Sequence, residues 1–298
     1  MKTIRLTILL FCSVFCCTLS AKETVSDALI GKLGYNILFT DNAADSIYIL
    51  SRKGNIIWSC FAKNSQAVHA LPNGNILFAH YDKGVAEVTE ITRDKKVVFN
   101  YQTTGEIHSC QRLKDGNTLI GVNSTAKIIE VNPQGKVVKE VQTQSKAKNH
   151  YSLRTVRKLD NGNYLAAQLG DHCVVEYTSD GSIVHTFPSP GDCFDAIRLK
   201  NGNTMISDGG ACSIREVTPS DEVVWMISKA DFPQLNFDWL AGIEIRSNGN
   251  ILCTNWLGHG KFGTGIPLFE VTRKKKLVFQ YTDNVRTKAI SNVCIMKK

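Results

Sequence analysis

Histidines and an arginine are the residues of this chain with the most versatile chemistry. Near neutral pH an imidazole serves as a general acid or base, as a nucleophile or as a metal ligand. A guanidinium suits a sulfate, carboxylate or phosphate group. His69 falls in a predicted first strand of a repeat, and His108 and Arg154 fall where one repeat leads into the next. These three residues are the candidate catalytic groups.

Other polar and aromatic residues stand in connections between predicted strands. A tryptophan beside a cleft suits a sugar ring or an aromatic ligand, and carboxylates and imidazoles add charge and hydrogen bonds. Polar residues are common in any loop, but here they gather in a few connections that recur between the predicted strands. The candidate ligand-binding residues are His80, His150, Asp171, His172, Asp195, Asp208, Trp239, Asn255 and Trp256.

A recurring tripeptide, Asn-Gly-Asn or Asp-Gly-Asn, predicts the strands that position these residues. Each copy stands between two short apolar runs, and the central glycines of successive copies lie 40 to 47 residues apart. A regular period of this size, built on strand-turn-strand units, is typical of a β-propeller. The central glycines are Gly74, Gly116, Gly162, Gly202 and Gly249.

Each repeat predicts one four-stranded blade. In the type unit the strands are expected at 68–71, 75–80, 85–89 and 96–101, with apolar alternation and β-branched residues. A glutamate is expected to recur at one structural position of the third strand. The copies of this glutamate are Glu87, Glu130, Glu176, Glu216 and Glu270.

The two ends of the chain predict a sixth blade. Segments 36–39, 46–50 and 54–58 match second, third and fourth strands, and 289–296 supplies the missing first strand. The sequence therefore predicts an all-β, six-bladed propeller, a single domain over 22–298 closed by its C-terminal strand, which removes exposed sheet edges.

The first 21 residues are expected to be a cleaved secretory signal. A basic start is followed by an apolar stretch at 6–19 and small residues at Ser20 and Ala21. The stretch is short for a membrane span, and a lipoprotein with Cys16 or Cys17 acylated is the alternative. The chain is expected to be exported, to the periplasm or outside the cell, and to be a monomer.

Charge and cysteine content indicate which binding partners and which cysteine chemistry to expect. The net charge is +8, and the basic run 273–276 falls at a predicted hairpin tip, so no nucleic-acid partner is expected. Seven cysteines follow the signal without CxxC spacing, so no metal site is expected, and an exported protein could form one or two disulfides among them. Cys253 takes the place of Phe78 in its repeat, which indicates a buried free thiol.

The string Leu71-Pro72-Asn73-Gly74-Asn75-Ile76-Leu77 resembles the repeat of exported bacterial propellers related to arylsulfotransferases. Two predicted fourth strands, at 54–58 and 223–225, finish on tryptophan and resemble repeats of quinoprotein-like (PQQ-type) propellers. The first resemblance implies six blades and sulfuryl transfer between phenols through a channel histidine, a scheme that His69, His108 and Arg154 could fit. This chain is much shorter than such enzymes. Because only two repeats end on tryptophan, a quinone cofactor is not expected.

Three functions follow from this reading. The first is binding of a glycan, peptide or small molecule on the loop-rich face around the central channel. The second is a histidine-dependent transferase, lyase or hydrolase on the same face. The third is a protein–protein scaffold, which would use the rim. A propeller fold alone does not decide among them.

Overall fold

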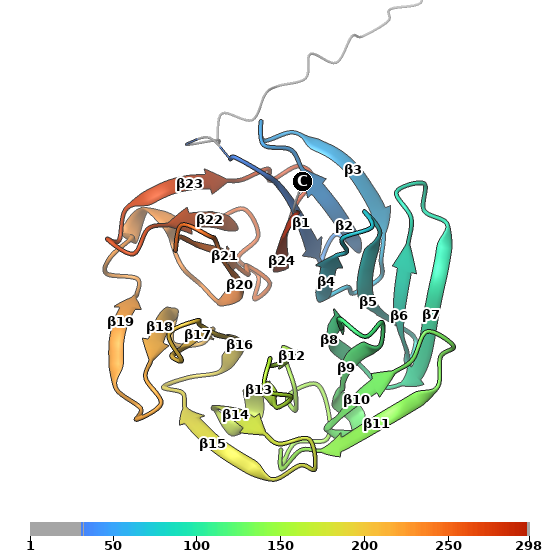
Figure 1. Cartoon of the computed structure of the whole chain (residues 1–298). Helices are drawn as coiled ribbons and strands as arrows, with labels where there is room; N and C mark the ends of the chain where they lie inside the picture. Colours follow the sequence, from blue (N-terminus) through green and yellow to red (C-terminus); the bar gives the residue numbers. More distant parts are fainter. Residues whose placement is uncertain (1–30, 32, 297–298) are drawn as a thin grey trace, which may run out of the picture.

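A computed structural model describes Gly31 and residues 33–296, and the predicted signal segment lies outside these residues. Six four-stranded antiparallel sheets surround a central axis as the blades of a propeller (Figure 1). Their order around the ring follows the chain. Blade 1 consists of β24 (Ile290–Met296), β1 (Asn36–Asp41), β2 (Ser46–Leu50) and β3 (Ile56–Phe61), in that order from the axis outward.

The other five blades each come from consecutive strands, with the first strand innermost. Blade 2 is β4 (Ala67–Ala70), β5 (Ile76–Asp82), β6 (Val85–Ile91) and β7 (Val97–Thr104), and blade 3 is β8 (Ile107–Arg112), β9 (Thr118–Val122), β10 (Lys127–Val131) and β11 (Val137–Gln142). Blade 4 is β12 (Val156–Lys158), β13 (Tyr164–Gln168), β14 (Cys173–Tyr177) and β15 (Ile183–Pro188). Blade 5 is β16 (Cys193–Arg198), β17 (Thr204–Asp208), β18 (Ser213–Val217) and β19 (Val223–Ile227), and blade 6 is β20 (Leu240–Ile245), β21 (Ile251–Asn255), β22 (Leu268–Val271) and β23 (Leu277–Tyr281).

The six-bladed architecture and its closure are confirmed. β24 pairs antiparallel with β1, with Phe39 opposite Val293, so the C-terminal strand completes the N-terminal blade. Burial explains why the blades stack. The two middle strands of each sheet are almost fully buried, whereas outer strands such as β11 and β15 are buried on one face only. Apolar side chains of neighbouring sheets therefore pack face to face around the ring.

The recurring tripeptide forms the turns between first and second strands. Its glycines have φ between 83° and 90°, a conformation that glycine adopts without steric cost. In blade 4 the Asn163 amide donates to Glu176 of the third strand at 2.6 Å, and Arg198 of blade 5 donates to the same carboxylate at 2.7 Å. Turn, third strand and next blade are thus joined by one buried carboxylate.

In blade 2 the glutamate that makes this contact is Glu90, so the expected repeat position Glu87 was wrong. Asn75 donates to Glu90 at 2.7 Å, and Glu90 pairs with Leu77 as Glu176 pairs with Leu165. β5 and β6 are each seven residues long, so their connection begins later and the alignment slips by three residues. Glu87 lies opposite His80 instead.

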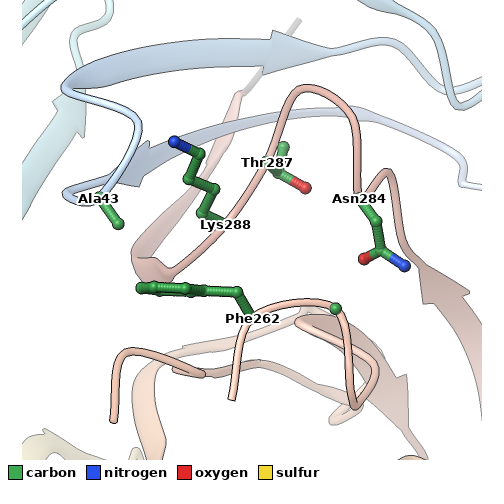
Figure 2. A pocket seen from close by; sticks show the side chains of 6 residues that line it. Ala43, Phe262, Asn284, Thr287 and Lys288 are labelled. Carbon is green, nitrogen blue, oxygen red and sulfur yellow. The ribbon is translucent and has the colours of Figure 1, made fainter. Parts of the chain in front are cut away.

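The connections between second and third strands, and those from blade to blade, share the opposite face. Three short 3₁₀ turns occur there: η1 (Asn123–Thr125), η2 (Leu169–Asp171) and η3 (Pro233–Leu235). A cavity of about 610 Å³ lies on this face between the connections of blades 1 and 6 (Figure 2). The seven described cysteines are free thiols, and Cys253 is fully buried as expected. The described residues include no helix long and apolar enough to cross a membrane.

Candidate functional site

Equivalent positions of the innermost strands form one layer around the axis. Strand pairing identifies the equivalent positions: in each blade one residue of the innermost strand pairs with the third residue after the turn tripeptide. These residues are Val68, Cys110, Val156 and Ala196. The residues two positions before them lie nearer the loop-rich face and form the layer of interest. In blades 2 to 5 this layer consists of Gln66, His108, Arg154 and Phe194. In blades 3 and 5 this residue occupies a β-bulge, and bulges re-aim side chains and recur beside active sites.

Arg154 reaches the centre of this layer. Its Nη1 lies 3.4 Å from the side-chain oxygen of Gln66 in blade 2, and its guanidinium lies 5.6 Å from the ring centroid of Phe194 in blade 5. Blades 2 and 5 stand on opposite sides of the six-membered ring (Figure 1). A side chain that contacts both must lie close to the propeller axis.

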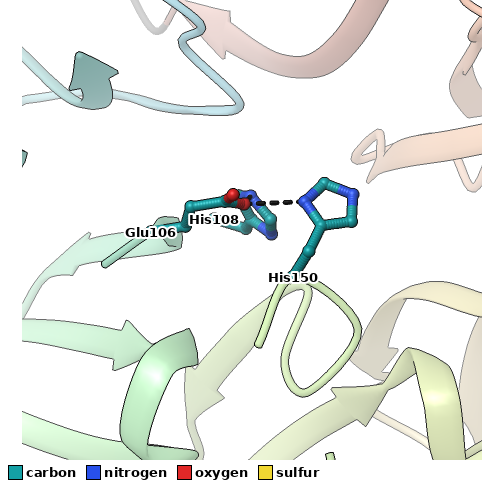
Figure 3. Close-up of side chains that lie close together, drawn as sticks. All are labelled: Glu106, His108 and His150. Atoms are coloured by element: carbon teal, nitrogen blue, oxygen red, sulfur yellow. Dashed lines mark hydrogen bonds and ion pairs between the residues drawn. The ribbon is translucent and has the colours of Figure 1, made fainter. Parts of the chain in front are cut away.

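Glu106, His108 and His150 lie close together (Figure 3), and Arg154 contacts both imidazoles. Glu106 precedes β8, His108 is the bulged residue of β8, and His150 comes from the connection that leads to blade 4. Oε2 of Glu106 lies 3.0 Å from Nε2 of His108 and 2.6 Å from Nδ1 of His150. One carboxylate oxygen is therefore shared by two imidazoles.

Arg154 contacts the other nitrogen of each imidazole. Its Nη1 lies 2.5 Å from Nδ1 of His108, and its Nη2 lies 2.8 Å from Nε2 of His150. Because a guanidinium only donates, these two nitrogens accept and the nitrogens facing Glu106 carry the hydrogens. These contacts define one tautomer for each histidine, and each ring lies between the Glu106 carboxylate and the Arg154 guanidinium.

Burial and charge act on the pKa values of this cluster in a consistent way. Burial and the neighbouring Arg154 lower the pKa of His108 to about 3. Hydrogen bonds from His108 and His150 hold the pKa of Glu106 below its usual range, and burial lowers the pKa of Arg154 to about 10. The cluster therefore contains one anion, one cation and a neutral buried histidine at pH 7.

Solvent reaches this cluster through His150. The side chain of His150 is 42% exposed and that of Glu106 is 29% exposed, whereas His108 is 4% exposed. Asn123 donates to Nδ1 of His108 at 3.2 Å and to the Leu153 carbonyl at 2.8 Å, which fixes the loop behind the site. A ligand approaching along the axis would meet His150 before His108.

Glu106, His108 and His150 place one ligand atom each within 4.8 Å of one another, as three metal ligands do. The arginine argues against a cation there. A metal-bound histidine normally donates its other N–H to an acceptor, but here that nitrogen accepts from Arg154. A metal at the nitrogens facing Glu106 would require both imidazoles to lose a proton or Arg154 to move away. The expectation of no metal stays a prediction.

The candidate catalytic residues do not all meet. His108 and Arg154 are in direct contact. His69 lies three residues after Gln66, the layer residue of the same blade, which is about 10 Å along an extended strand. Its Nδ1 accepts from the backbone amide of Arg112, near the tripeptide turns. His69 therefore belongs to the other end of the axis.

The two candidate tryptophans form a second cluster on the loop-rich face of blade 6. Trp239 and Trp256 pack edge to face, with ring centroids 6.4 Å apart, and exposed His259 packs against both. The indole of Trp239 rests on Gly209, where an added Cβ would lie within 2.1 Å of its ring nitrogen. Asn255 is fully buried and accepts from the amides of Asp238 and Trp239, so it holds this loop.

The remaining candidate residues take part in local contacts of the scaffold. Asp195 and Asp208 are buried and paired with Arg157 and Arg215, respectively. The other three candidates lie in or beside connections on the loop-rich face. Asp171 accepts from the Lys146 amide, His172 pairs with Asp192 at 2.9 Å, and His80 bonds Thr89 within blade 2. Their expected roles in ligand binding stay predictions.

Sequence reasoning missed Glu106, Asn123 and Gln66 as members of the site. Glu106 stands two residues before His108, and alternate residues of an extended segment point the same way, so this spacing was the available signal. Gln66 is found only by aligning all innermost strands on the tripeptide, because it lies at the level of His108 in a different blade.

Neither a protein-family model nor a curated protein sequence matches this chain. Solved structures do share its fold. A protein of unknown function from Bacteroides caccae is 25% identical with a TM-score of 0.79, and the match covers 89% of this chain and 99% of that one. Virginiamycin B lyase from Staphylococcus aureus is 12% identical with a TM-score of 0.61, covering 89% and 87%. A streptogramin B lyase is 13% identical with a TM-score of 0.60, covering 87% and 90%.

Proposed function

We propose that this protein is an enzyme of the lyase type, which abstracts a proton from a carbon next to a carbonyl or carboxylate group. His150 is the base, and Arg154 pairs with the oxygen that gains charge. The observation that carries the proposal is the position of His150, with Nδ1 2.6 Å from Glu106 and Nε2 2.8 Å from Arg154. A histidine backed by a carboxylate is a common general base.

Substrate binding would activate this base. A carbonyl or carboxylate oxygen that takes the Nη2 hydrogen of Arg154 leaves Nε2 of His150 without its donor. The C–H bond then breaks, its proton moves to Nε2, and its electron pair forms an enolate whose oxygen stays paired with Arg154. Expulsion of a leaving group from the next carbon forms a double bond, and His150 returns the proton to that group. No further reactant is needed.

The contacts of His108 favour this scheme over sulfuryl transfer through a nucleophilic histidine. Its nitrogens contact Glu106 and Arg154 as those of His150 do, but its ring is buried, so a substrate cannot displace Arg154 from it. A nucleophile needs a free lone pair that faces the substrate. His108 instead fixes Glu106 and Arg154 in place.

The structural comparisons are compatible with this reading. Two neighbours with the same fold are named as lyases, and a histidine-to-alanine variant of virginiamycin B lyase, solved with quinupristin, is described as catalytically inactive. At 12–13% identity these likenesses carry the fold alone, so the reaction is inferred from the geometry of His150 and Arg154.

The test is a screen of lactones, cyclic depsipeptides such as quinupristin, and uronate-containing glycans, with products followed by mass spectrometry. Elimination leaves the summed product mass unchanged, whereas hydrolysis adds one water. We expect His150→Gln to lower turnover at least about 100-fold, within the usual contribution of a general base. His185→Gln, which changes an outer-strand histidine paired with Asp221, is the matched control. Equal activity in both variants, or products with added water, would overturn the proposal.

Binding of a glycan or peptide without chemistry is the second candidate, and the Trp239–Trp256 pair favours it. Paired indoles beside an exposed histidine offer a platform for a sugar or aromatic ring. We expect Trp256→Ala to weaken a glycan ligand found by array screening, with His150→Gln as a neutral control. Unchanged affinity after Trp256→Ala and Trp239→Ala would remove this candidate.

A further inference from the structure

The cavity between blades 1 and 6 is built from three connections on the loop-rich face (Figure 2). Ala43 comes from the β1–β2 connection, Phe262 and Gly263 come from the β21–β22 connection, and Asn284, Thr287 and Lys288 precede β24. Its volume of about 610 Å³ falls within the range of small-molecule sites. None of these residues belongs to the Glu106–Arg154 cluster.

Hydrogen bonds hold the walls of the cavity in place. The indole N–H of Trp256 donates to Asn42, next to Ala43, at 2.8 Å, and the backbone amide of Ala289 donates to the buried Asp41 at 3.0 Å. Thr287 Oγ1 donates to the Asp283 carbonyl at 2.8 Å. Hydrogen bonds therefore hold the β1–β2 connection and the segment before β24, so these two walls need little ordering when a ligand binds.

The Lys288 ammonium is a cation without a fixed partner. Among the described residues, no hydrogen bond or ion pair joins its Nζ to another group. The acidic residues of the surrounding connections are already engaged: Asp45 pairs with Lys63 at 2.9 Å, and Asp283 pairs with Arg286 at 2.6 Å. The Asp41 carboxylate accepts hydrogen bonds from the backbone amides of Lys288 and Ala289. The charge of Lys288 contributes, with that of Lys63, to a lowered pKa of Asp45, but no described group holds its Nζ at hydrogen-bond distance, so the ammonium can pair with an anion.

Phe262 supplies an apolar wall opposite this cation. Its side chain is exposed, and Figure 2 shows its ring on the other side of the cavity, with a face turned toward Lys288 and Ala43. A large exposed aromatic ring that lines a cavity suits a flat ring in van der Waals contact. The Lys288 ammonium opposite the Phe262 ring therefore suits a ligand with one negative charge and one flat apolar face.

We propose that this cavity binds a small carboxylate that carries a six-membered ring. The carboxylate pairs with Lys288 and the ring lies on Phe262. A phosphate is a poorer fit, because phosphate sites usually gather several donors or an arginine. A uronate sugar and an aromatic acid share this chemistry. The site goes beyond the proposed lyase activity and does not depend on it.

Calorimetric titration of the whole protein tests the proposal with two acids and their neutral counterparts. Glucuronate and benzoate are the probes, with glucose and benzyl alcohol as the uncharged pair. We expect at least one acid to bind and its neutral partner to bind about tenfold more weakly, the usual effect of one charge-assisted hydrogen bond. The acid that binds identifies a sugar or an aromatic source.

Variants locate the site. Lys288→Gln should weaken the acid about tenfold, Lys288→Arg should retain it, and Phe262→Leu should weaken acid and neutral ligand alike. Lys276→Gln, at the exposed β22–β23 hairpin, is the matched control, and circular dichroism verifies the fold. His150→Gln should bind unchanged, which separates this site from the proposed active site. No binding of either acid, or equal binding by Lys288→Gln, would overturn the proposal.

Discussion

His108 and His150 have the same side chain and the same two partners, but they differ in access. Each lies between Glu106 and Arg154. His108 faces Glu106 with Nε2 and Arg154 with Nδ1, whereas His150 faces Glu106 with Nδ1 and Arg154 with Nε2. Burial of His108 leaves it no approach for a substrate, whereas His150 is 42% exposed. We infer that His108 positions the charged pair and His150 reacts.

His108 makes the stability of the protein depend on pH. Its pKa is about 3 in the folded chain, against about 6.5 when unfolded, so the stability it contributes is complete above pH 6.5 and is lost as pH falls toward 3. Between pH 7 and pH 5 we expect a loss of about 2 kcal/mol. Urea unfolding of the wild type and of His108→Gln should show this difference, because groups that do not contact His108 cancel between the two and Glu106 titrates mainly below this pH range. Parallel pH dependence in both proteins would contradict the assignment.

Glu106 is expected to matter for turnover more than for folding. Glu106→Gln replaces the charge behind His150 with an amide, so His150 loses the anion that supports its protonated form. We expect kcat to fall about 100-fold with little change in KM, since the effect belongs to the transition state. The pH–rate profile of the proposed lyase reaction is the measurement. A change in KM alone would indicate that Glu106 only binds substrate.

At the scale of the blade, the tripeptide turn and the third-strand glutamate form a clamp between neighbouring sheets. Glu176 is buried and accepts from Asn161, Asn163 and Arg198, and its hydrogen bonds with the two asparagines and Arg198 lower its pKa despite burial. The clamp lies at the end of the blades opposite the candidate site. The repeat therefore determines the scaffold, and the variable connections determine the site.

Removing one carboxylate charge from the clamp should destabilise the protein. Glu176→Gln leaves Arg198, which is 26% exposed, with a weaker partner and disturbs the Asn163 contact. We expect a loss of about 2–4 kcal/mol in the free energy of unfolding. Glu222→Gln, on the exposed β18–β19 turn, is the control and should change stability by less than about 0.5 kcal/mol. Equal stability of the two variants would show that the clamp contributes little.

Sequence periodicity was sufficient for the elements and insufficient for the site. Strands repeat because each blade buries the same faces, so the tripeptide predicts them, and the slip from Glu90 to Glu87 arose where β5 and β6 are longer. The partnership of His108 with Arg154 depends on two blades meeting at the axis. Gln66 belongs to another blade and repeats no motif, so spacing along the chain does not mark it, and the two-residue spacing of Glu106 from His108 does not reveal their shared contact with His150.

At the scale of the whole molecule, the candidate site arises where the symmetry of the ring is broken. The layer that holds His108 and Arg154 holds Gln66 and Phe194 at equivalent positions. Six nearly equal blades fix the backbone, and each contributes a different side chain to the axis. The chemistry of the axis can therefore change by single substitutions that leave the strands intact.

β24 closes the ring, and we expect this closure to stabilise the whole arrangement. β24 supplies the innermost strand of blade 1 and packs against blades 2 and 6, and Asp41 holds its start through the amides of Lys288 and Ala289. A chain ending at Ala289 leaves β1 as an open edge beside a missing wall of the axis. We expect it to aggregate or to lose its cooperative thermal unfolding, measured by light scattering and calorimetry. A chain ending at Met296 keeps the whole strand and should behave as the wild type. If the shorter chain stayed monomeric with an unchanged Tm, the five complete blades would be self-sufficient and closure would contribute nothing to stability.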